Sequence, residues 1–138
     1  MKKIVLDTNF VMDLLARGDE GLESNAIKVL EIGKRRRAKF YVSFLTVANF
    51  AYICRKESKE NLSNNLKKCC KLFEVISNDK SNILKAIERN PSDFEDALQL
   101  EAALTKKCDC IITRDPKGFE DSPIPILSPL EFLESIKK

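Results

Sequence analysis

The chain has 138 residues, of which 43% are hydrophobic and 33% charged, so it is long enough for one domain with a hydrophobic core and too short for two ordinary ones. A single domain over residues 1–138 is expected. The apolar runs are too short for a membrane span and no signal-like segment is present, so the cytoplasm is the expected location. Five cysteines and no histidine favour reduced thiols and exclude catalysis by histidine.

Short apolar runs that end in polar residues alternate with helical patterns, which predicts an α/β fold. Strands are expected, in chain order, at residues 4–6, 39–43, 73–76, 110–112 and, at the sheet edge, 124–127. Helices are expected, in chain order, over residues 10–16, 23–34, about 47–53, 58–70, 78–89, from 93 through 104, and as a short final helix. For the helix after residue 92, Ser92 is the expected N-cap and Glu95 completes a capping-box pattern.

Four aspartates are expected to meet at one edge of the sheet. Asp7 and Asp115 each follow an apolar strand, and Asp93 and Asp96 lie three residues apart on one face of a helix start. The carboxyl edge of an open α/β sheet is the usual place for ligands. Grouped carboxylates repel one another unless a cation neutralises them, and oxygen ligands favour Mg²⁺ or Mn²⁺. The sequence therefore predicts a divalent metal site and a phosphate ester as substrate.

Each of these acids also has a structural interpretation. Asp7 can cap a turn, Asp93 can stabilise the first turn of its helix, and Asp115 stands before Pro116 as a turn residue. Asp96 is hardest to explain structurally, because it lies among apolar residues on a helix that should be largely buried. Asp13 falls inside the first helix and is expected to be exposed.

Other side chains have expected roles around the same edge or in the core. Thr8, Asn9, Ser43 and Thr113 follow or end strands, and each either supports a ligand-bearing acid, water or phosphate oxygen or is an ordinary cap. Cysteine spacing gives no convincing zinc site. The phenylalanines expected in the core are Phe40, Phe44, Phe50, Phe73 and Phe94.

Positive charge is clustered locally. Residues 34–39 contain Lys34, Arg35, Arg36, Arg37 and Lys39, and a second cluster contains Lys67, Lys68 and Lys71. Such clusters are either solvated helix ends or phosphate contacts. Under the second interpretation, the arginines expected to bind substrate are Arg35, Arg36, Arg37 and Arg114.

Four segments in this order, IVLDTNFVMDLL, SFLTVANFAYI, DFEDALQLEAAL and CDCIITRDPKGF, resemble the PIN domain family, including toxin nucleases of VapC type. The resemblance spans almost the whole chain. It implies a three-layer α/β/α sandwich around a mainly parallel sheet of four to five strands. It also implies a metal-dependent endoribonuclease that uses Mg²⁺ or Mn²⁺, leaves 5′-phosphate and 3′-hydroxyl ends, pairs with a small antitoxin and forms a homodimer.

By position in the family's motifs, Asp7, Asp96 and Asp115 match the metal-binding acids, and Asp93 is an accessory acid. Asn49 stands where the family often has a glutamate, so one negative charge is missing, although an amide oxygen can still accept a bond from metal-bound water. Gly118 stands where many relatives carry another acid.

Two alternatives to a ribonuclease remain open from the sequence. One is a catalytically weak or inactive PIN-like binding or regulatory module, for which the neutral Asn49 would be the sign. The other is an α/β domain that is phosphorylated on Asp7. Such domains usually carry a second aspartate two residues further on, where this chain has Asn9.

Overall fold

The computed structural model describes residues 1–137 and shows one sheet of five parallel strands. The strands lie in the order β3-β2-β1-β4-β5. Their bounds are β1 Lys3–Leu6, β2 Lys39–Ser43, β3 Glu74–Ile76, β4 Cys110–Ile112 and β5 Ile126–Leu127. The predicted parallel sheet of four to five strands is confirmed, with the last strand at the edge as expected.

Helices connect the first four strands of the chain, and a single 3₁₀ turn lies between β4 and β5. The helices are α1 Thr8–Leu15, α2 Glu20–Arg35, α3 Phe44–Ile53, α4 Lys59–Leu72, α5 Lys80–Glu88, α6 Phe94–Thr105 and α7 Pro129–Ile136, with the 3₁₀ turn, η1, at Pro116–Gly118. Among residues 1–137, none of these helices has the length and apolar character needed to span a bilayer.

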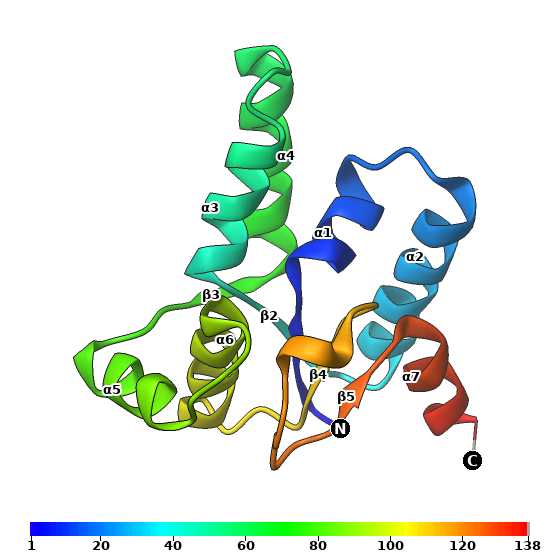
Figure 1. The fold of residues 1–138 in the computed structure, drawn as a ribbon. Helices are drawn as coiled ribbons and strands as arrows, with labels where there is room; N and C mark the ends of the chain where they lie inside the picture. Colours follow the sequence, from blue (N-terminus) through cyan, green and yellow to red (C-terminus); the bar gives the residue numbers. More distant parts are fainter. Residues whose placement is uncertain (138) are drawn as a thin grey trace.

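Two hydrophobic clusters on opposite faces of the sheet make the three predicted layers. Ile4 and Leu6 of β1 point to a cluster built with α1, α2, α3, α4 and α7. Val5, between them, points to the other cluster, built with α6. Helix α5 packs on α6 (Figure 1). The α/β/α sandwich is therefore confirmed, and the alternation within the three buried residues of β1 explains why helices cover both faces.

Three local expectations are wrong. The N-cap of α6 is Asp93, whose Oδ1 accepts a 3.0 Å bond from the backbone N–H of Asp96, and the hydroxyl of Ser92 instead contacts Glu120. Phe44 and Phe94 are 61% and 44% exposed, because each is the first residue of its helix and lies at the margin of the packed layers. The other three expected core phenylalanines are buried.

Candidate active site

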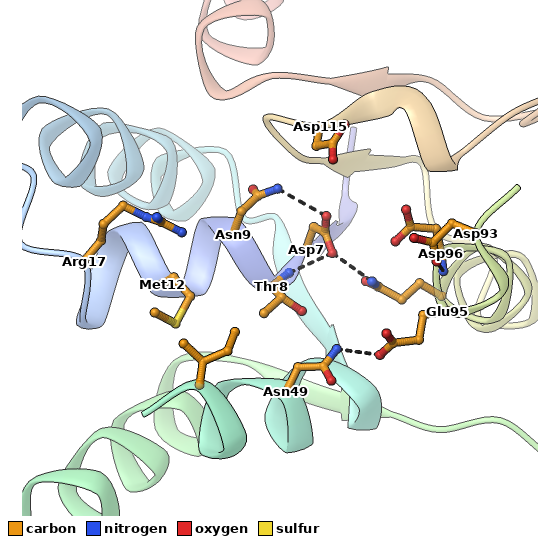
Figure 2. A pocket seen from close by; sticks show the side chains of 12 residues that line it. Asp7, Thr8, Asn9, Met12, Arg17, Asn49, Asp93, Glu95, Asp96 and Asp115 are labelled. Atoms are coloured by element: carbon orange, nitrogen blue, oxygen red, sulfur yellow. Dashed lines mark hydrogen bonds between the residues drawn. The ribbon is translucent and has the colours of Figure 1, made fainter. Parts of the chain in front are cut away.

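A cavity of about 280 Å³ lies at the carboxyl edge of the sheet, where β1 and β4 end and α6 begins (Figure 2). Helix α6 runs antiparallel to the strands, so its first turn reaches the same edge as the ends of β1 and β4. Five carboxylates line the cavity: Asp7, Asp93, Glu95, Asp96 and Asp115. The structure thus brings together all four aspartates singled out in the sequence and adds a glutamate.

Asp7 is only 7% exposed, and both of its carboxylate oxygens accept hydrogen bonds. Oδ1 accepts from the backbone N–H of Thr8 and from Nε2 of Gln99, each at 2.8 Å. Oδ2 accepts from the hydroxyl of Thr113 at 2.8 Å and from Nδ2 of Asn9 at 3.4 Å. Donors from α1, from α6 and from the residue that follows β4 therefore fix the orientation of this carboxylate.

The supporting residues expected from the sequence divide into two groups. Thr8, Asn9 and Thr113 contact Asp7, and Asn9 also donates to the Thr113 hydroxyl at 2.9 Å. Ser43 does not line the cavity. Its fully buried side chain accepts a bond from the backbone N–H of Leu45 at 3.1 Å and caps α3, as its alternative interpretation stated.

Asp96 is the most strongly perturbed acid of the cavity. Its pKa is raised from 3.8 to about 7, first by burial and then by the negative charges of the other four carboxylates that line the cavity. Its carboxylate lies against Gly118, because a Cβ built at Gly118 would overlap Oδ2 of Asp96. Glycine at position 118 thus leaves room for the Asp96 carboxylate in its present orientation.

Asn49 lines the cavity from α3 and meets Glu95 of α6 there. Its Nδ2 donates to Oε1 of Glu95 at 2.6 Å. The neutral amide therefore contacts a carboxylate whose sequence pattern indicates only a capping box. Where Asn49 leaves the site one charge short, Glu95 adds one from the facing helix.

Gln99 was also missed. It is 2% exposed and donates to Asp7 through Nε2, while its Oε1 is the one buried side-chain nitrogen or oxygen without a hydrogen-bond partner within the described residues. It lines the cavity one turn after Glu95 on the same face of α6. A single polar residue between Leu98 and Leu100 was the only signal available in the sequence.

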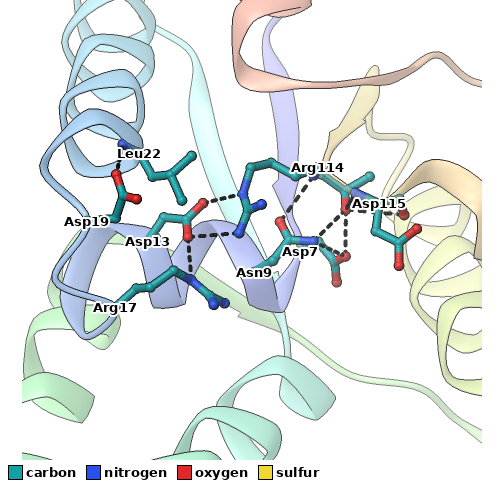
Figure 3. Close-up of polar contacts among 9 residues, drawn as sticks. Asp7, Asn9, Asp13, Arg17, Asp19, Leu22, Arg114 and Asp115 are labelled. Atoms are coloured by element: carbon teal, nitrogen blue, oxygen red, sulfur yellow. Dashed lines mark hydrogen bonds and ion pairs between the residues drawn. The ribbon is translucent and has the colours of Figure 1, made fainter.

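Asp13, expected to be exposed, is 3% exposed and binds two arginines (Figure 3). Arg114 donates from Nε to Oδ2 at 2.6 Å and from Nη2 to Oδ1 at 3.1 Å, and Arg17 donates from Nε to Oδ1 at 2.8 Å. Arg114 follows β4, so an approach made 101 residues later buries Asp13. Hydrogen bonds to Asp13 raise the pKa of Arg114, which keeps its charge in this pair.

The cluster Arg35, Arg36 and Arg37 is not brought to the cavity. These residues end α2 and precede β2, so they lie at the amino edge of the sheet, opposite the acids. Arg36 instead donates from Nη2 to the backbone carbonyl of Ile136 at 2.9 Å. A helix that returns the chain to the start of the next parallel strand necessarily ends at that edge.

The cavity fits a hard divalent cation in the chemistry of its donors, since carboxylate oxygens surround it, and burial together with the neighbouring negative charges raises the pKa of Asp96. Within residues 1–137, however, no three acidic or cysteine side chains already converge as a ligand set. Both oxygens of Asp7 are held by protein donors. The donor types are therefore present, and a cation would have to draw them together.

Residues 3–117 match the sequence profile of the PIN domain family. The chain belongs to this family. A ribonuclease VapC1 from Aquifex aeolicus (strain VF5) is 27% identical over an alignment of 140 positions, and the alignment covers 96% of this chain and 94% of the relative. Because the chain is a PIN domain, it is not assigned to the other class of α/β domain, in which Asp7 would be phosphorylated.

Solved structures of the same fold agree with the PIN assignment. A toxin-antitoxin complex from Klebsiella pneumoniae has a TM-score of 0.67 at 21% identity, covering 91% of this chain and 97% of that one. VapC20 from Mycobacterium tuberculosis, described as a sarcin-ricin loop cleaving toxin, has a TM-score of 0.66 at 14% identity, covering 84% and 92%. At these identities the likeness concerns the fold.

Proposed function

We propose that this PIN-domain protein is a metal-dependent endoribonuclease that hydrolyses phosphodiester bonds in RNA. The observation that carries the proposal is the meeting of five carboxylates, from three separate parts of the chain, in one small cavity. Such a concentration of negative charge suits an ion and a phosphate ester. The relative named a ribonuclease supports RNA as the substrate.

Asp7, Asp96 and Asp115 would hold one or two Mg²⁺ or Mn²⁺ ions. When bound, the metal activates a water molecule and offsets charge on the phosphate. The chain's own groups set the geometry. Gln99 and Thr113 hold the Asp7 carboxylate, Asp93 caps the helix that carries Asp96, and Asn49 holds Glu95 at the cavity. Cleavage is expected to leave 5′-phosphate and 3′-hydroxyl ends.

The proposed biological role is the toxin of a toxin-antitoxin pair. Support comes from the Klebsiella structure, whose title names such a complex, and from the VapC name of the Aquifex relative. A small antitoxin as partner, a homodimer and a cytoplasmic location belong to this proposal. Growth arrest on expression, and co-purification of a small protein encoded beside this chain, would support it. Unaffected growth with no co-purifying partner would contradict it.

A binding or regulatory module is the second candidate. The observation that favours it is the neutral Asn49 together with carboxylates that do not already converge on one point within residues 1–137. Such a module would bind RNA or a partner protein without cleaving RNA. The two candidates differ in whether RNA is cut.

The test is cleavage of a mixed RNA pool by the purified protein with Mn²⁺, with Mg²⁺ and with EDTA. An Asp96→Asn variant and a Glu134→Gln variant accompany it; Glu134 is an exposed residue of α7 whose side chain pairs with Lys137. Cleavage that needs metal and Asp96 but tolerates Glu134→Gln is the expected result. Intact RNA in every lane, with Mn²⁺ binding absent as well, would favour the binding module.

A further inference from the structure

Arg17 is the only basic residue among the twelve that line the cavity. Figure 2 places it at the end away from Asp93 and Asp96, with Thr8 and Asn9 of α1 between them. The other arginine near the site, Arg114, does not line the cavity. A cation at one end of a cavity and acids at the other suit a ligand with several negative groups along its length.

The chain holds Arg17 in place through its backbone and its side chain. Its backbone N–H donates to the carbonyl of Met12 at 2.7 Å, which closes the end of α1. Gly18 follows with a φ of +78°, a conformation that residues with side chains rarely adopt, and turns the chain toward α2. The Nε of Arg17 donates to Asp13 at 2.8 Å. The guanidinium is therefore oriented before any ligand arrives.

Arg17 is not needed to neutralise Asp13. Arg114 already binds that carboxylate through two bonds, one to each oxygen. Asp13, Arg17 and Arg114 carry one negative and two positive charges, so Asp13 alone does not neutralise both arginines. The side chain of Arg17 is 44% exposed against 3% for Asp13, so the charge of Arg17 lies at the surface of the cavity.

The free part of the Arg17 guanidinium can bind a phosphate. Within residues 1–137 its ion pair uses Nε alone, and Nη1 and Nη2 make no hydrogen bond to other described residues. A guanidinium presents its donors in a planar fork that matches two phosphate oxygens.

We propose that Arg17 binds a phosphate of the RNA backbone that flanks the phosphodiester to be cleaved. The proposal rests on the proposed function and adds the residue that places the RNA strand in the cavity. Asp13 is then a positioning residue, because it holds Arg17 at the cavity and Arg114 beside the segment that carries Asp115.

The test measures the affinity of a short fluorescein-labelled single-stranded RNA over a series of NaCl concentrations, in an Asp96→Asn background with EDTA to prevent cleavage. Arg17→Gln, Arg17→Lys and Lys85→Gln are compared; Lys85 is an exposed residue of α5 and loses the same charge on substitution. Loss of a charged hydrogen bond to phosphate predicts roughly tenfold weaker binding for Arg17→Gln. The slope of log K against log salt should fall by about 0.7.

Arg17→Lys should keep the salt slope and lose part of the affinity, because lysine keeps the charge but not the fork. Lys85→Gln should behave as the parent protein. Unchanged binding by Arg17→Gln, or an equal loss in Lys85→Gln, would overturn the proposal. If Arg17→Gln lowers the melting temperature, Arg17→Lys decides: an affinity and salt slope both equal to those of the parent protein would overturn it.

Cleavage by the wild-type protein in metal separates this proposal from the nuclease. Wild-type protein that leaves RNA intact while Arg17→Gln loses RNA binding would contradict the nuclease and leave the phosphate contact supported. Wild-type protein that cleaves RNA while Arg17→Gln binds normally would do the reverse.

Discussion

Asn49 of α3 and Glu95 of α6 meet across the candidate active site, with Nδ2 of Asn49 donating to Oε1 of Glu95 at 2.6 Å. The two residues come from parts of the chain that are 46 positions apart. This hydrogen bond holds the Glu95 carboxylate at the cavity, beside the uncharged side chain of Asn49. Amide and acid therefore act as a pair, and changing either one should alter how the site binds a cation.

The first prediction concerns Asn49→Glu. The substitution replaces a hydrogen bond with two carboxylates in contact, so the ion-free protein should lose stability and the affinity for Mn²⁺ should rise. Isothermal titration with Mn²⁺ and thermal unfolding in EDTA measure the two effects. Glu95→Gln, which removes a carboxylate and keeps the shape, should bind Mn²⁺ more weakly. Weaker Mn²⁺ binding by Asn49→Glu would show instead that the amide is needed to hold Glu95.

The second prediction concerns pH. Because the pKa of Asp96 is raised from 3.8 to about 7, its contribution to stability is fully present below the unfolded value and is lost as pH rises through the folded value. The ion-free protein should therefore lose stability between about pH 4 and about pH 7. Asp96→Asn stays neutral, so its melting temperature in EDTA should exceed that of the wild type near pH 8 and approach it near pH 4.

Added Mn²⁺ provides the control for the pH prediction. It should stabilise the wild-type protein near pH 8, because a bound cation offsets the charge of Asp96, and it should stabilise Asp96→Asn much less. Thermal melts of the two proteins that change in parallel with pH would contradict the assignment of the raised pKa to this residue.

The positions of Asp7, Asp96 and Asp115 could be predicted from the sequence, because local patterns place them. An acid after a buried parallel strand must lie at the carboxyl edge, and the helix that precedes β4 must begin there. The same reasoning applied to Arg35, Arg36 and Arg37 would have placed them at the amino edge. They lie away from the acidic cavity, so their contact with substrate stays a prediction that rests on charge alone.

The residues that the sequence did not reveal depend on contacts between distant elements. Glu95 enters the site because α3 brings Asn49 opposite it, and Gln99 because Asp7 lies beside α6. Asp13 is buried because Arg114 returns to it from the end of β4. Periodicity within one helix carries no information on which neighbour will face a given side chain, so these three contacts required the structure.

The third prediction concerns Gly118→Ala. The added methyl group would overlap the carboxylate of Asp96, whose side chain can rotate away without moving the backbone. Cleavage and Mn²⁺ affinity should therefore fall by roughly tenfold, while the free energy of unfolding should change by less than about 1 kcal/mol. RNA cleavage and urea unfolding measure the two quantities. Full activity in this variant would show that Asp96 need not occupy its present position.

The fourth prediction concerns Asp13→Asn. Removing the charge leaves two arginines beside a neutral, buried amide, and breaking a buried pair on one side typically costs about 3–5 kcal/mol. The partial exposure of both arginines places the expected loss toward the lower end of that range. Urea unfolding measures this loss of stability. The comparison is Glu134→Gln, which breaks the exposed pair with Lys137 and should lower the free energy of unfolding by less than about 1 kcal/mol. Equal stability of the two variants would contradict the role of Asp13.

The fifth prediction concerns Gln99→Leu, which separates stability from function. The substitution removes a donor to Asp7 and, with it, the buried Oε1 that has no partner within the described residues. Removing an unsatisfied acceptor offsets much of the lost hydrogen bond, so the free energy of unfolding should stay within about 1 kcal/mol of the wild type. Asp7 keeps its bonds from Thr8 and Thr113 but loses one restraint, so cleavage should fall by roughly tenfold. A variant that is strongly destabilised, or fully active, would show that Gln99 has a structural role and does not position Asp7 for the reaction.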